Sequence, residues 1–246
     1  MNEAPSFVPL SAFSPLTFTF RILERDFMGV AGPLFVAALI GQLQWLLLGV
    51  GLIDDLAAVV LLLAVWLPIG SWCTAGMLRF SLKIARGQSY GYRDLWSIDA
   101  TVLQLMLLQL VAYVAIAATV FVLAIVTPRT GTEEADWLAS IPSRAHALGT
   151  AGQLAVAFAL AGVWLVVLTR TAVAPVLIVD ERAGVFRALA RSVALTRGNS
   201  VAIFLYGIIL GLIGGMASTI FGGAVLSALS APGIVYLALA VRGELV

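Results

Sequence analysis

The residues best suited to chemistry lie in one charged stretch between two long apolar runs. It contains Arg170, Pro175, Asp180, Arg187, Arg191, Ser192 and Arg197. Arg187 and Arg191 are four residues apart, so they share one side of a helix. A helix lying in the headgroup plane of a membrane can present such arginines to anionic lipid. The stretch therefore predicts a surface for anionic lipid or a partner, and Arg86 and Arg93 of an earlier charged segment can share it.

Catalytic and metal chemistry is disfavoured by what the chain contains. There is a single histidine, His146, and a single cysteine, Cys73. One histidine removes most metal-ligand and His-based catalytic schemes, and one cysteine cannot form a disulfide within the chain. The apolar runs also lack the nucleophile with a base, or the pair of carboxylates, that an intramembrane enzyme needs. We therefore expect a non-enzymatic protein with no catalytic residues, no metal site and no cofactor.

The composition is that of a membrane protein. Of 246 residues, 61% are hydrophobic and 11% are charged, whereas soluble domains carry about 25% charged residues. The net charge of +1 gives no electrostatic reason to expect a nucleic-acid partner. The fold class we predict is all-α, a polytopic membrane helix bundle in which residues 1–246 form a single integral membrane domain.

Six apolar runs are long enough to cross a bilayer, whose core of about 30 Å needs roughly 20 helical residues. The expected spans are residues 28–53, 56–78, 100–127, 147–170, 200–221 and 224–242. The uncharged run 199–241 accommodates two spans, and Gly222-Gly223 is the expected turn between them. A break at Pro232-Gly233 would leave too few residues for a sixth crossing.

The basic residues predict the orientation. If the N-terminus is cytoplasmic, twelve of the 14 lysines and arginines lie inside, and only Arg129 and Arg144 lie outside. Cytoplasmic loops carry this excess of basic residues. We therefore expect a multi-pass protein of the plasma (inner) membrane with both termini in the cytoplasm and the loop 129–146 outside.

Two amphipathic helices are expected at the cytoplasmic interface. One, over residues 16–27, places Arg21 and Arg25 opposite an apolar side formed by Leu16, Phe20, Leu23 and Phe27. The other, over residues 182–197, has an apolar side formed by Val185, Phe186, Leu189 and Val193. Gly198 suits the end of this second helix.

Several residues inside the apolar runs indicate helix packing. Gly207, Gly211 and Gly215 stack on one helix side, where glycine lets another backbone approach closely. This stripe predicts packing within the bundle, and a homo-oligomer or partner interface is the alternative. Glutamines in the runs are expected to hydrogen-bond between helices.

Arg170 has two open interpretations. At the end of a span it can snorkel to the inner interface. If the helix continues past it, Arg170 lies within the inner leaflet and needs a lipid phosphate or an acidic partner. Pro175 would kink or end such a helix.

These residues carry a family resemblance. The chain resembles the membrane domain fused to some glycerophosphodiester phosphodiesterases, together with uncharacterised six-helix relatives in bacteria and archaea. The motifs are Arg170…Pro175-Val-Leu-Ile-Val-Asp180…Ala188-Leu-Ala-Arg191-Ser192…Arg197-Gly198, Ala85-Arg86-Gly87-Gln88…Asp94-Leu95-Trp96 and Tyr236…Val241-Arg242. The family often has Glu at Asp180 and Trp at Val193. The resemblance implies a helical membrane module of no established activity, because the catalytic domain of those enzymes has no counterpart here.

Two functions follow as expectations. The first is an accessory or scaffold subunit that engages anionic lipid or a protein partner through its basic cytoplasmic surface. The alternative is a permease or lipid-translocating subunit whose groove runs beside Arg170 and Pro175 and is lined by glutamine side chains.

Overall fold

The computed structural model describes residues 10–49, 56–126, 150–216 and 220–244, and every regular element in these ranges is a helix. The all-α prediction is confirmed for this part of the chain. The structure divides into two compact units, Met1–Gln109 with Thr169–Val246, and Leu110–Leu168. Each is described on its own. The predicted outer loop 129–146 lies outside the described residues.

The first apolar run begins as an irregular helix. Helix α1 (Ser14–Arg25) is followed by a π-helical turn η1 (Phe27–Ala31) and by α2 (Gly32–Gly49). The Asp26 carboxylate accepts a hydrogen bond from the Gly29 N–H at 2.9 Å and so caps the π-helical turn. Helix α1 starts two residues before the expected 16–27, where Pro15 supplies a preset backbone angle in the first turn.

Helix α3 (Leu56–Ala85) is longer than the sequence suggested. The helix runs past residue 78, where the membrane span is expected to end, and continues through Arg79 to Ala85. The helix continues because Arg79 and Lys83, one turn apart, find carboxylates alongside it. Arg79 pairs with Asp99 at 2.5 Å and Lys83 pairs with Asp94 at 2.6 Å. The short helix α4 (Tyr92–Trp96) lies in the segment that supplies these acids.

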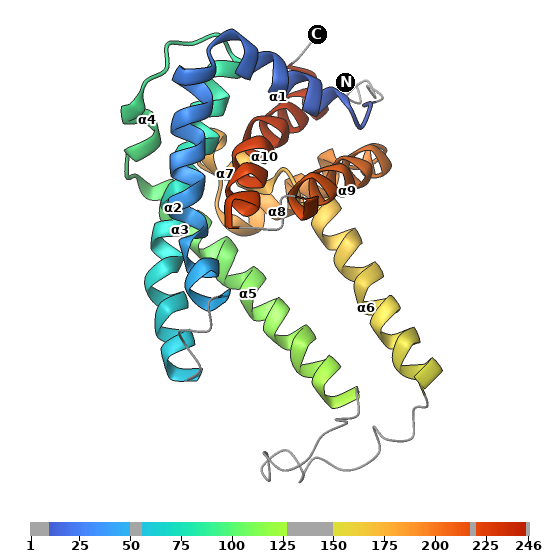
Figure 1. Ribbon diagram of the computed structural model, residues 1–246. Helices are drawn as coiled ribbons and strands as arrows, with labels where there is room; N and C mark the ends of the chain where they lie inside the picture. Colours follow the sequence, from blue (N-terminus) through green and yellow to red (C-terminus); the bar gives the residue numbers. More distant parts are fainter. Residues whose placement is uncertain (1–9, 50–55, 127–149, 217–219, 245–246) are drawn as a thin grey trace. The chain divides into compact units, whose positions relative to one another are not determined.

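The C-terminal half of the larger unit contains four helices. They are α7 (Ala174–Glu181), α8 (Val185–Leu195), α9 (Ser200–Met216) and α10 (Ile220–Val241). Helix α10 packs against α1, α2, α3 and α9 (Figure 1). Gly222 and Gly223 lie inside α10, so the expected turn there is wrong; α9 ends at Met216 and α10 begins at Ile220. Helix α10 also continues through Pro232.

The core of this unit surrounds α7. Val176, Leu177 and Ile178 are fully buried in a helix of 8 residues, and α7 packs against α3, α8 and α10. Pro175 stands in the first turn of α7, after a break in the helical chain at residues 172–173. At its other end, Arg182 adopts a left-handed conformation with φ of 53°, a common way to end a helix.

Amide side chains tie these helices together. Gln42 of α2 donates to Ser227 of α10 at 2.9 Å, and Gln109 accepts from Ser71 of α3 at 2.8 Å. The expectation that intramembrane glutamines bond between helices is confirmed for these two residues. Glycine also allows close contact, since a Cβ on Gly76 of α3 would lie 2.0 Å from the Leu95 carbonyl oxygen.

The smaller unit consists of parts of two helices. They belong to α5 (Ala100–Val126) and α6 (Thr150–Thr171). Within the unit, the Trp164 indole N–H donates to the Thr119 hydroxyl at 2.9 Å. Apolar side chains such as Val114 and Phe158 are exposed over much of their surface. Such surfaces are expected of helices that face lipid.

Four helical segments among the described residues are long and apolar enough to cross a membrane. They are Val60–Ala85, Ala100–Thr119, Ala155–Glu181 and Ala224–Val241. Helices α8 and α9 are bent by 108° relative to each other and make a fifth if they count as one span. The segment Phe27–Gln42 is apolar but shorter. Four to five candidate spans are therefore present.

Candidate functional site

Asp180 is the centre of a cluster of ion pairs at the end of α7. Arg86, which directly follows α3, donates from Nη1 to Oδ1 at 2.6 Å and from Nη2 to Oδ2 at 2.8 Å. Arg242, which directly follows α10, donates from Nη1 to Oδ2 at 2.7 Å. Two parallel bonds between a guanidinium and a carboxylate fix both distance and orientation. Asp180 therefore clamps the ends of α3 and α10 to the end of α7.

Two more acids and one more arginine complete this cluster. Glu181 accepts from Arg191 of α8 and lies 3.6 Å from Arg242. Glu244 accepts from Arg86 at 3.1 Å and also pairs with Arg242. We call these three carboxylates and three guanidiniums the Asp180 cluster. The charges balance, and the Asp180 hydrogen bond raises the pKa of Arg86, so this arginine stays protonated.

The Asp180 cluster contains three residues that the sequence had singled out. Asp180, Arg86 and Arg191 were expected to share one surface, and the structure does bring them into one cluster. They are paired within the cluster, however, Arg86 with Asp180 and Arg191 with Glu181, instead of standing free for an external anion. Sequence reasoning missed Glu181 and Glu244. Their position at the ends of long apolar runs, beside arginines, was the available signal, because unpaired charges there are costly.

A second set of ion pairs fixes the segment after α3. Besides its bond to Asp99, Arg79 donates to the Ser97 carbonyl oxygen at 2.6 Å and to the Thr101 hydroxyl at 2.8 Å. Burial by itself would raise the pKa of Asp99, but hydrogen bonds from Thr101 and the charge of Arg79 outweigh it, and the pKa lies below its ordinary value. This set holds the start of α5 against the end of α3.

Arg170 stands at the last turn of α6, where its backbone is engaged by α8. Its carbonyl oxygen accepts from the Ser192 hydroxyl at 2.7 Å and from the Thr196 hydroxyl at 3.4 Å. Ser192 is fully buried, so it holds α8 in place and is not part of an open surface. The Arg170 Nη1 atom is buried and has no hydrogen-bond partner among the described residues. No acidic partner for this side chain is therefore found in the described part of the chain.

Helix α8 presents three different sides. Val185, Ala188 and Ser192 are buried against the protein. Phe186 and Val193 are exposed, Phe186 to 77%, and Arg187 and Arg191 lie on a third side. The predicted apolar side is therefore divided, because Val185 belongs to the core while Phe186 and Val193 remain outside. Gly198, with φ of 88°, follows the end of the helix as predicted.

Besides Arg170, three of the predicted basic residues have no acidic partner among the described residues. Arg187, Arg197 and Arg93 are exposed, and no carboxylate of the described residues forms an ion pair with them. The structure thus separates the predicted basic surface into the neutralised Asp180 cluster and these free arginines. Of the predicted surface in the described residues, these three exposed arginines can bind an external anion without first breaking an internal pair.

The glycine stripe of α9 is not used for packing between the described helices. Gly207 and Gly211 are exposed, and no atom lies within 4 Å of where their Cβ would be. The residues of α9 that pack are Ile203, Tyr206 and Leu210, on another side of the helix. The expected packing at these two glycines is therefore not seen among the described helices and stays a prediction. The surroundings of Gly215 lie outside the described residues.

The chemistry available in these sites is ion pairing and anion binding. Within the described ranges, no group of three histidine, cysteine, aspartate or glutamate residues is placed to hold a metal ion. No protein-family profile, curated protein or solved structure matches this chain. The resemblance to the phosphodiesterase-associated membrane domain therefore rests on its sequence motifs.

Proposed function

We propose that this protein is a non-enzymatic, six-span protein of the plasma membrane that acts as an accessory or scaffold subunit. In this proposal both termini are cytoplasmic, and α8 lies in the inner headgroup layer. Four to five of the described helical segments have the length and apolarity to span. The excess of basic residues in the segments assigned to the cytoplasm supports the orientation.

The observation that carries the proposal is that exposed apolar side chains and arginines without an acidic partner lie next to each other on α8. Phe186 is 77% exposed and is followed directly by Arg187, which has no acidic partner in the described structure. A large exposed apolar side chain is unfavourable in water, while a guanidinium is unfavourable in hydrocarbon. The headgroup layer of an anionic membrane satisfies both.

The Asp180 cluster supports a scaffold more than a moving carrier. It ties the ends of α3, α7, α8 and α10 through charged hydrogen bonds, and a rocking bundle would have to break them. Gln42 and Gln109 bond to hydroxyls of neighbouring helices, so they are not free to line a permeation path. The permease alternative retains one supporting observation, the unpartnered Arg170 Nη1.

A fluorescent label on α8 tests the proposal. In a Cys73→Ser background, Val193→Cys carries an environment-sensitive dye on the exposed apolar side. The full-length protein is reconstituted into vesicles of phosphatidylcholine alone or mixed with phosphatidylglycerol. We expect a blue-shifted emission in the anionic vesicles, because the free arginines draw α8 to the surface. Arg187→Gln with Arg197→Gln should reduce this shift by more than half.

The matched control is Glu24→Gln, an exposed charged residue on α1 that lines neither surface and should leave the shift on α8 unchanged. Equal emission in the two vesicle types, or a shift that survives loss of both arginines, would contradict the proposal. Impermeant cysteine reagents applied to the same labelled position report its side of the membrane. Labelling from the outside would refute the orientation.

A further inference from the structure

One side of α1 forms a groove that the α8 surface does not include. Ser14, Phe18, Arg21 and Arg25 follow one another at spacings of four, three and four, so they share one side of the helix. This side borders a hollow of about 330 Å³ that extends to Ile84 in the last turn of α3 and to Tyr90 beyond the end of that helix. A second hollow of about 300 Å³ shares Phe18 and Arg21 and adds Ser11, Ser14, Thr17 and Tyr236 of α10.

The two arginines of this groove are free of internal ion pairs. No carboxylate in the described ranges forms a salt bridge with Arg21 or Arg25, in contrast to the six charged groups of the Asp180 cluster. The neighbouring Asp26 is already engaged, since its Oδ1 accepts from the Gly29 N–H and its Oδ2 from the Tyr90 hydroxyl at 3.4 Å. The groove therefore presents two unneutralised guanidiniums, five donors each, to an external acceptor.

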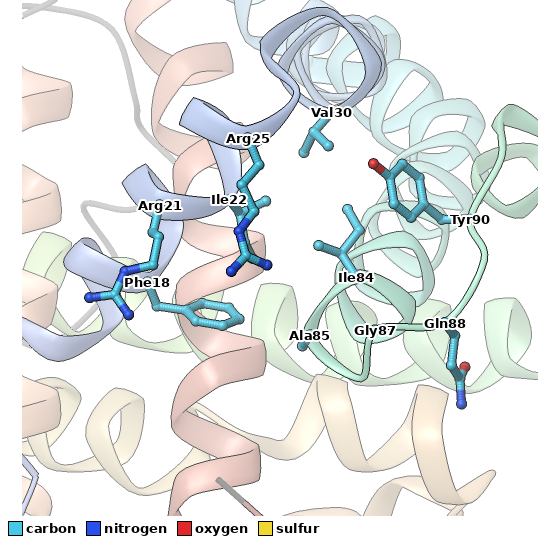
Figure 2. A pocket seen from close by; sticks show the side chains of 10 residues that line it. All are labelled: Phe18, Arg21, Ile22, Arg25, Val30, Ile84, Ala85, Gly87, Gln88 and Tyr90. Carbon is cyan, nitrogen blue, oxygen red and sulfur yellow. The ribbon is translucent and has the colours of Figure 1, made fainter. Parts of the chain in front are cut away.

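Beside its two arginines, the groove has an apolar lining, which we call the apolar wall. It consists of Phe18 and Ile22 of α1, Val30 of η1, and Ile84 and Ala85 of α3. Figure 2 shows the Arg25 side chain extending from α1 towards Ile84 and Ala85, so charge and apolar surface face the same hollow. Ring contacts hold two of the lining aromatic side chains in place. The ring centroids of Phe18 and Tyr236 lie 5.0 Å apart, and those of Tyr90 and Phe80 lie 5.2 Å apart. Such support favours a site that exists before its ligand arrives.

We propose that this groove binds the headgroup of one anionic phospholipid. Its phosphate accepts hydrogen bonds from Arg21 and Arg25, and its glycerol and first acyl carbons lie against the apolar wall. A volume of about 330 Å³ falls within the range of small-molecule pockets, roughly 300–1,000 Å³. An inorganic phosphate would use the arginines and leave the apolar wall uncovered, and this favours a lipid. No residue of α8 lines this groove, so an experiment can refute the lipid site in the groove and leave the proposed role of α8 standing, or the reverse.

Native mass spectrometry of the full-length protein can test the groove. The protein, purified in a neutral detergent, is titrated with phosphatidylglycerol or with phosphatidylcholine, and the one-lipid complex is quantified. We expect phosphatidylglycerol to bind more tightly. Arg25→Gln should weaken it roughly tenfold, which corresponds to about 1.4 kcal/mol. Arg187→Gln, on α8, serves as the matched control and should leave the affinity of this one lipid unchanged.

Millimolar inorganic phosphate is added as a competitor to separate the two sources of a phosphate group. If it displaces phosphatidylglycerol completely from the wild type, the groove is a site for soluble phosphate and the lipid proposal is overturned. Unchanged binding in Arg25→Gln, or an equal loss in Arg187→Gln, also overturns it. Arg25 is exposed, and the unfolding midpoint of its variant should match that of the wild type, so a loss of lipid reports the site itself.

Discussion

The Asp180 cluster gives the sharpest prediction about stability. Asp180→Asn removes the charge that holds Arg86 and Arg242 and keeps nearly the same side-chain volume. The Asp180 side chain is 9% exposed and that of Arg242 is 13% exposed. Removing one partner of a buried ion pair costs about 3–5 kcal/mol, because the other charge is left uncompensated.

The structure places the expected loss at the lower end of that range. Arg242 keeps its contacts with Glu181 and Glu244, and Arg86 is one-third exposed and keeps Glu244. An exposed pair adds only about 0–1 kcal/mol. We therefore expect Asp180→Asn to lower the free energy of unfolding by about 3 kcal/mol, a large part of the roughly 5–15 kcal/mol typical of folded proteins.

The assay is equilibrium unfolding in mixed micelles, with sodium dodecyl sulfate as the denaturant and tryptophan fluorescence as the signal. Glu24→Gln is the matched control, since Glu24 is exposed and has no ion pair in the described structure. The double variant Asp180→Asn with Arg242→Gln should lose less than the sum of the single changes. A loss for Asp180→Asn below about 1 kcal/mol, equal to that of the control, would refute the buried-pair reasoning.

Two further predictions concern the close packing at Gly76 of α3 and the ion pair between Asp99 and Arg79. Gly76→Ala should destabilise the protein by about 1–3 kcal/mol or more, because its Cβ would meet the Leu95 carbonyl oxygen at 2.0 Å. The control Gly207→Ala would place its Cβ where no atom lies within 4 Å, and it should be tolerated. Equal unfolding midpoints in the two variants would contradict the close packing at Gly76. The lowered pKa of Asp99 means that its pairing with Arg79 stabilises the fold above the unfolded-state pKa of about 3.9 and is lost as pH falls through the lower folded-state value. The stability advantage of the wild type over Asp99→Asn should therefore shrink below about pH 4, and an advantage independent of pH in unfolding titrations would exclude this role.

The sequence by itself determined the class of this protein and the existence of most of its helices. Apolar runs of about 20 residues with few charges favour helices, because a helix bonds its backbone polar groups within the segment. The start of α1 at Ser14-Pro15, the break before Pro175 and the helix ending near Gly198 followed from local backbone preferences. Local preferences act over a few residues and can be read one segment at a time.

Only the tertiary structure decided which charges were already neutralised. Arg86 and Arg187 look alike in the sequence, yet Arg86 meets Asp180, 94 residues away, and Arg187 meets no carboxylate among the described residues. Pairing between distant segments depends on how helices pack, which periodicity within one segment does not specify. For the same reason the sequence does not predict the groove beside Arg21 and Arg25, because residues of both α1 and the end of α3 line it.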